Sequence, residues 1–187
     1  MDRTIKKELN RRDKKVTKDS KWIIEVIILS FVISLLFSLI SELFLTNLPI
    51  ALGIILYIVV ISIGILFDII GVSVTSANEA IFHSMNSRKI KGASLAVRFK
   101  KNANKVSNLC CDVIGDICGI ISGSIAVALA TSLAKVFNIN LFVFLILFSA
   151  ITATLTIGGK ALGKSYAINK SNLILFEFAK VVSNFYY

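Results

Sequence analysis

The chain has 187 residues, of which 56% are hydrophobic and only 17% are charged, and its mean hydropathy is +0.81. Soluble globular domains carry about 25% charged residues, so this composition excludes an ordinary soluble globule. The net charge of +10 would suit nucleic acid, but the basic residues gather beside long apolar runs. We therefore expect a lipid bilayer, and no nucleic acid, as partner.

Four apolar runs are long enough to cross a membrane. A hydrocarbon core of about 30 Å needs about 20 helical residues. The runs cover approximately residues 22–45, 49–72, 113–134 and 139–157. We therefore predict an all-α integral membrane protein with four transmembrane helices.

The basic residues predict which ends of the spans face the cytoplasm. Nine of the 21 precede Trp22, seven lie in 88–105, and four follow the last apolar run, which leaves Lys135 alone for the opposite side. Short loops rich in Lys and Arg stay cytoplasmic. We expect a multi-pass protein of the cell membrane with both termini in the cytoplasm and with residues 1–21 as a basic tail.

The first apolar run follows a basic segment, as in a signal peptide. It is longer than a signal peptide's apolar region, however, and no small-residue cleavage site closes it. We predict that 22–45 is retained as an additional N-terminal anchor. Because the connecting turn 46–49 is short, the first and second spans are expected to form an antiparallel helical hairpin.

Two segments outside the spans are amphipathic. Residues 79–110 are predicted to form two short helices broken near Gly92, the second with Leu95 and Phe99 on one face and basic residues on another. A further apolar segment with terminal tyrosines covers 171–187. Both patterns are typical of helices that lie on the cytoplasmic leaflet.

Acidic and polar residues fall at the ends of the spans. Asp112 and Asp116 are four residues apart and therefore share a helix face, and Ser76 and Asn78 end the second span. Magnesium prefers such oxygen ligands, so these four residues form a candidate metal site. For Asp112, solvation near the headgroups is the alternative, whereas Asp116 is one turn deeper and is expected to have an internal role.

Lys160 follows the last span. Ionisable groups within a membrane are costly and need a partner, and Asp116 is the obvious one. We therefore predict an ion pair between Lys160 and Asp116.

Small residues mark one face of the third span. Gly115, Gly119 and Gly123 recur at every fourth position. Because lipid gives helices no hydrophobic reason to associate, such rows allow close helix packing. The row predicts either packing within the chain or a homodimer contact.

No enzymatic centre is predicted. The sequence has no Ser/His/Asp set, no phosphate-binding glycine loop and no paired-cysteine metal motif. We expect no enzymatic activity and assign no resident cofactor.

Three stretches resemble the transmembrane domain of the CNNM/CorC (cyclin M-like) magnesium transporters. Residues 76–86 are similar to the family's Ser-Gly-x-Glu-Thr-Ala-x-x-Ser-x-Asn signature, 113–116 to its Leu-Ile-Gly-Asn turn, and 159–164 to its Gly-Glu-x-x-Pro-Lys segment. The matching residues are Ser76, Glu79, Ser84, Asn86, Gly115, Gly159 and Lys164.

The resemblance covers about 47–187 and implies a dimeric, three-span domain that transports magnesium through oxygens at the positions of Ser76, Asp116 and Lys160. Two of these positions are altered here. Where the family has an amide the chain has Asp116, and where the family has a carboxylate it has Lys160. Gly163 replaces a proline, and we expect no CBS domain pair of the kind that usually follows in the family.

Three functional hypotheses follow. In the first, the chain is a divalent-cation (magnesium) transporter-like membrane protein whose ion site is replaced by the Asp116–Lys160 pair. In the second, transport persists through a rearranged site of Ser76, Asn78, Asp112 and Asp116, with Lys160 as a switch. In the third, the chain is a non-transporting scaffold or regulatory partner of another membrane protein.

Overall fold

A computed structural model describes residues 24–25, 27–36, 39 and 49–185. Every regular element in these ranges is a helix, which confirms the predicted all-α class for this part of the chain. The elements are α2 (Ile50–Ser76), α3 (Glu79–Ser87), α4 (Ala93–Lys101), α5 (Ala103–Asn108), the π-helical turn η1 (Leu109–Ile114), α6 (Gly115–Phe137), α7 (Leu141–Asn169) and α8 (Ser171–Phe185).

Three helices are long and apolar enough to cross a membrane, so the chain is a membrane-embedded protein. They are α2, the continuous helix Ala103–Phe137, and α7. Each overlaps most of one of the three later predicted spans. The first predicted span, 22–45, lies largely outside the described residues, within which Ile27–Leu36 forms a short apolar helix. The fourth span therefore stays a prediction.

All three helices extend beyond the predicted spans, α2 by four residues to Ser76. The third span begins at Ala103 because η1 joins α5 to α6 without a break, so the end of the amphipathic segment predicted over 79–110 belongs to this long helix. The segment divides at Asn102, whose side-chain amide donates to the Arg98 carbonyl 3.0 Å away and ends α4. The last long helix, α7, continues past the predicted span end at 157 to Asn169.

The predicted break near Gly92 is present. Gly92 has a φ of +89°, a left-handed conformation that glycine adopts without steric cost. A methyl group added there would also lie 3.0 Å from the Lys180 Cα atom, because α8 passes directly beside it. Glycine is thus required at this position both for the turn and for the contact.

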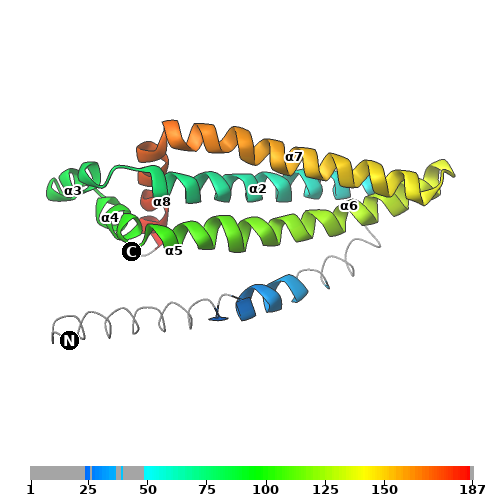
Figure 1. Cartoon of the computed structure of the whole chain (residues 1–187), viewed down its shortest axis with the longest axis horizontal. Helices are drawn as coiled ribbons and strands as arrows, with labels where there is room; N and C mark the ends of the chain where they lie inside the picture. The colour runs from blue at the N-terminus through cyan, green and yellow to red at the C-terminus, as the bar shows by residue number, and fades with distance from the viewer. Residues whose placement is uncertain (1–23, 26, 37–38, 40–48, 186–187) are drawn as a thin grey trace, which may run out of the picture.

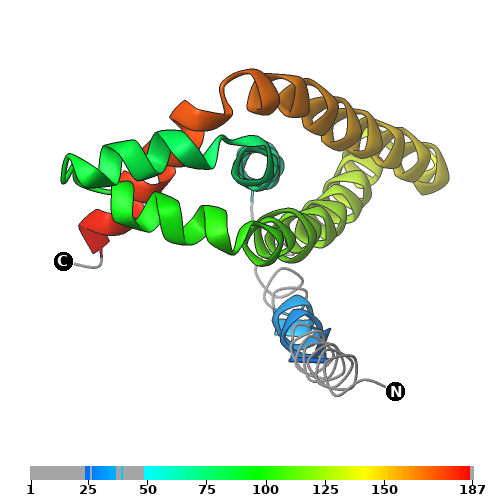
Figure 2. The same cartoon turned by 60° about the vertical axis from the view of Figure 1, so that its left-hand side comes forward.

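The three long helices lie side by side, and α3, α4 and α8 gather at one end of them (Figure 1). We call this the capped end, and the opposite end, where residues 138–140 connect α6 to α7, the turn end. Figure 2 shows α2 between α6 and α7 at the capped end, where these two helices are separated. They converge toward the turn end, so their arrangement is wedge-shaped.

Glycines of α2 make its contact with α6. Methyl groups added at Gly53, Gly64 and Gly71 would lie 2.9 Å from Leu129 Cδ2, 3.0 Å from Cys118 Cβ, and within overlap of the Cys111 sulfur atom, respectively. The three glycines are separated by eleven and seven residues, which are close to whole numbers of helical turns. They therefore form one face along which the two backbones approach closely.

The contact between α2 and α7 uses glycines of the other helix. The side chains of Ile65 and Ile69, one turn apart on α2, rest on Gly159 and Gly163 of α7. A methyl group at Gly163 would lie 2.7 Å from Ile69 Cγ1. This packing supports α7 beyond residue 157, where the last predicted span ends.

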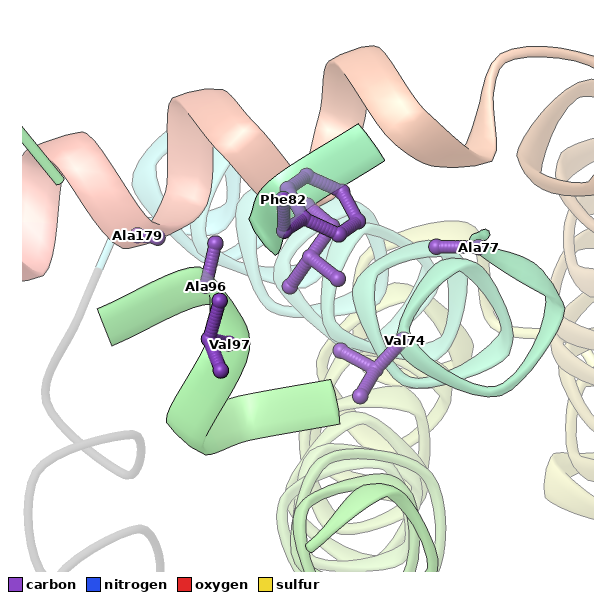
Figure 3. Close-up of a cluster of buried hydrophobic side chains, with 7 residues drawn as sticks. Val74, Ala77, Phe82, Ala96, Val97 and Ala179 are labelled. Carbon is purple, nitrogen blue, oxygen red and sulfur yellow. The ribbon is translucent and has the colours of Figure 1, made fainter. Parts of the chain in front are cut away.

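The helical cap has its own apolar core. We call it the cap cluster: Val74, Ala77, Phe82, Ala96, Val97, Leu175 and Ala179. Figure 3 shows these side chains meeting where the end of α2 faces α3, α4 and α8. Phe82 and Leu175 are completely buried. The apolar faces of the cap helices therefore pack against protein, while their contact with a leaflet stays a prediction.

Polar contacts fasten the cap to α2. The Lys100 ammonium donates to the carbonyl oxygens of Thr75 (2.7 Å) and Val74 (3.2 Å), at the negative end of the α2 dipole. The Asn172 side chain accepts from the Asn78 backbone N–H at 2.8 Å, which ties the α2–α3 junction to α8. The C-terminal end of α2 is thus anchored from two helices.

The glycine face of α2 predicts a steric effect. Gly71→Ala should lower the free energy of unfolding in detergent by about 1–3 kcal/mol, the usual cost of overpacking. The added methyl group would meet the Cys111 sulfur atom and the Ser107 carbonyl oxygen, the latter at 3.2 Å. Gly119→Ala is the control, since no atom lies within 4 Å of the added group. Equal unfolding midpoints for the two variants would contradict this packing.

The lysine cap of α2 gives a second prediction. Lys100→Met keeps a long side chain but removes both hydrogen bonds to the α2 carbonyls. The free energy of unfolding should therefore fall by about 1–3 kcal/mol, which is measured as a lower thermal unfolding midpoint. Lys101→Met removes the same charge from an exposed neighbouring position and should have little effect. If both variants unfold with the wild-type midpoint, Lys100 does not stabilise the cap.

Candidate functional site

The structure brings Asp116 and Lys160 together across two helices. Lys160 Nζ on α7 lies 3.9 Å from Asp116 Oδ1 on α6, within ion-pair range but beyond the 2.7–3.2 Å of an N–H···O hydrogen bond. The Lys160 side chain is 34% exposed and that of Asp116 is 71% exposed. The pair is therefore a contact at the edge of the bundle and is not enclosed by this chain.

Glycines make this meeting possible. Lys160 extends over Gly115, where an added methyl group would lie 3.6 Å from Nζ. At the same level Gly64 of α2 faces α6, and Gly159 of α7 receives the Ile65 side chain. All three long helices thus approach one another at this height, which we call the ion-pair level.

The ion-pair level lies about one hydrocarbon thickness from the turn end. Lys160 is about 28 Å along α7 from Leu141, and Asp116 is about 31 Å along α6 from Phe137, at 1.5 Å per residue. A bilayer core is about 30 Å thick. If the turn end marks one surface, the charged pair marks the other, at the depth where side chains meet headgroups.

The residues of the predicted metal set occupy different heights in the bundle. Gly71 of α2 lies against Cys111 of the facing helix. Ser76 is five residues from that contact toward the cap, and Asp116 is five residues from it in the opposite direction. The two side chains are therefore separated by about 15 Å along the bundle axis.

The other two members also differ in role and exposure. Asn78 begins α3, where its side-chain oxygen accepts from the Ala80 backbone N–H at 3.0 Å. Asp112 is exposed on η1, one turn from Asp116. In the described part of the chain no three His, Cys, Asp or Glu side chains gather in a cluster suited to a metal ion. Because magnesium requires near-octahedral oxygen ligation, the four residues do not fit it in this arrangement.

Most residues that match the family signature lie away from the ion pair. Glu79, Ser84 and Asn86 are on α3 in the cap, and Glu79 contacts His83 at 3.1 Å. Lys164 is exposed one turn beyond Lys160 on α7. Of the matching positions, Gly115 and Gly159 are the ones at the ion-pair level.

A cavity of about 520 Å³ opens between α6 and α7, with α2 as its back wall. We call it the groove; its lining includes Gly115, Gly119, Ser122, Gly123, Ala126, Leu145, Phe148, Ser149, Thr152, Thr156 and Lys160. Nothing in the described chain lies within 4 Å of a methyl group added at Gly119 or Gly123. Gly119 and Gly123 therefore line an open space, whereas Gly115 packs within the chain beneath Lys160 and against Gly64. The role of the row in a homodimer stays a prediction.

The hydroxyl groups of the groove are largely occupied by hydrogen bonds. Ser122 donates to the Gly119 carbonyl at 2.9 Å and Thr156 to the Thr152 carbonyl at 2.7 Å. Thr152 also contacts the buried Tyr57 hydroxyl of α2 at 2.7 Å. With its hydroxyls paired, the groove is apolar along its length except at Lys160, the one charged residue in its lining.

Sequence reasoning did not identify the groove, although part of its signal is visible. Ser149, Thr152, Thr156 and Lys160 recur at intervals of three and four residues and so share one face of α7. The glycine row supplies the opposite wall. What the sequence does not reveal is that the two rows face each other across an open space.

Comparisons with protein-family models, curated proteins and solved structures find no match to this chain. The resemblance to the magnesium transporters therefore stays a prediction carried by the three sequence stretches.

Proposed function

We propose that this chain is a membrane domain of the magnesium-transporter type in which its own ammonium group takes the place of the transported ion. The observation that carries the proposal is the 3.9 Å approach of Lys160 Nζ to Asp116 Oδ1. The family resemblance implies a carboxylate at the position of Lys160 and an amide at that of Asp116. In this proposal the Lys160 ammonium lies beside the Asp116 carboxylate in the place where the family would hold a metal ion.

The electrostatics of the pair disfavour a divalent cation. At about 4 Å and an effective dielectric constant of about 20, two unit charges interact by about 4 kcal/mol. A magnesium ion at that distance from both groups would gain about 8 kcal/mol from Asp116 and lose about as much to Lys160. Solvent screens the 71% exposed Asp116 more than Lys160, which is 34% exposed, so the sum does not favour the ion.

The distribution of charge supports an orientation for this domain. In the described range 49–185, Lys135 lies near the turn end, and the other basic residues lie at the ion-pair level or nearer the cap. Because Lys and Arg accumulate on the cytoplasmic side, the cap faces the cytoplasm of a cell-membrane protein. We propose that the domain acts there without moving magnesium and without an enzymatic reaction.

A second candidate function is that of a scaffold or regulatory partner for another membrane protein. The observation that favours it is the exposure of α7, whose most apolar stretch has no residue buried inside the chain. Phe142, Ile146 and Leu147 are each more than half exposed. A stoichiometric partner that copurifies with the full chain from its own membranes, and whose binding depends on these side chains, would support this role.

The proposal predicts that magnesium handling can be gained. The double change Asp116→Asn with Lys160→Glu installs the pair that the resemblance implies, and it should make vesicles containing the full chain permeable to magnesium. Magnesium flux is followed with an indicator enclosed in the vesicles. Wild-type vesicles should show only the flux of empty vesicles.

A matched control changes the same charges one turn away on the same two helices. Asp112→Asn with Lys164→Glu alters net charge equally but leaves the ion pair intact, so it should give no flux. Magnesium flux through the wild-type chain would overturn the proposal. So would a double variant that unfolds at the wild-type temperature yet neither binds nor moves magnesium.

A further inference from the structure

The groove has the length of a lipid tail. Its α6 wall runs from Gly115 to Val127 and its α7 wall from Leu145 to Lys160, which correspond to about 18 and 22 Å. One leaflet contributes about 15 Å to the hydrocarbon core of a bilayer. The groove therefore extends from the ion-pair level to beyond the middle of the membrane.

Its volume suits a slender occupant. The groove encloses about 520 Å³ between α6 and α7. A cavity of this size is within the range of about 300–1,000 Å³ that small-molecule sites occupy.

One end of the groove differs in chemistry from the rest. Lys160 closes the end of the groove, about 28 Å along α7 from the turn end, and an ammonium group has three N–H donors. Its ion-pair contact in the described chain is the 3.9 Å approach to Asp116, which is too long for a hydrogen bond. An anion at this end of the groove can therefore accept from Lys160, while solvent at the 71% exposed Asp116 carboxylate screens its repulsion of that anion.

We infer that the groove binds one anionic phospholipid, with an acyl chain between α6 and α7 and its phosphate at Lys160. Lipid tails are as apolar as the groove, so placing a tail there gains little over leaving it in the bilayer. Selection among lipids must then come from the charged end. The site should discriminate by headgroup charge, and this does not depend on whether the domain transports an ion.

The headgroup test measures lipid retention by native mass spectrometry of the full chain in detergent. Phosphatidylglycerol and phosphatidylcholine with identical acyl chains are the probes. The wild type should retain one phosphatidylglycerol per chain in preference to phosphatidylcholine, and Lys160→Gln should reduce that preference roughly tenfold, as expected for one charge-assisted contact. Lys164→Gln removes the same charge from an exposed site one turn away, and this variant should keep the wild-type preference for phosphatidylglycerol.

The groove test uses Gly119→Leu, which fills open space without meeting an atom of the chain near its Cβ. Retention of both lipids should fall to background, while Ala150→Leu, on an exposed position of α7 outside the groove, should retain them. Unchanged thermal unfolding shows that each variant is folded.

Three results would overturn the inference. One is equal retention of the two lipids by the wild type. Another is displacement of the lipid by inorganic phosphate with no effect of Gly119→Leu, which would assign Lys160 to a free anion. The third is a dimer that Gly119→Leu converts to monomer without changing lipid retention, which would assign the groove to a second copy of the chain.

Discussion

The structure depends on close approach of helix backbones at glycine. Within a bilayer, helices gain no hydrophobic free energy by associating, because lipid tails are as apolar as their side chains. Gly53, Gly64 and Gly71 let α2 touch α6, while Gly159 and Gly163 let α7 close over α2. Because α2 is held between the other two helices at the capped end, it separates them there. That separation opens the groove, and the long Lys160 side chain crosses it over Gly115 toward Asp116.

The sequence predicts a helix well where the length and apolar content of its own segment determine its extent. It predicts a helix less well where packing against another helix determines that extent. The three described spans follow from runs of about 20 apolar residues. The extension of α7 does not, because the Gly158–Gly159 pair weakens a helix locally and the side chains of Ile65 and Ile69 that support it belong to another helix. The early start of the third span at Ala103 likewise depends on η1, for which no local signal stands out.

The candidate site shows the same division. Opposite charges at similar depth on two spans predict the proximity of Asp116 and Lys160, and the structure places them 3.9 Å apart. The separation of Ser76 from Asp116 follows from the register of α2 against α6, which is set by Gly71 against Cys111. Register between two helices is a pairwise property, so a motif within one segment does not encode it. The four-residue spacing of Gly115, Gly119 and Gly123 predicts that they share one helix face. It does not indicate whether another helix packs against that face.

The open glycines carry an argument of their own. Alanine at Gly119 or Gly123 would meet no atom of the described chain, and in a water-exposed helix it would be favoured over glycine by about 1 kcal/mol. Neither the conformation of α6 nor its contacts within the chain therefore calls for glycine there. A methyl group at either position would instead project into the groove. Glycine at these two positions therefore keeps the groove open, and the proposed acyl chain with its phosphate at Lys160 would occupy that space.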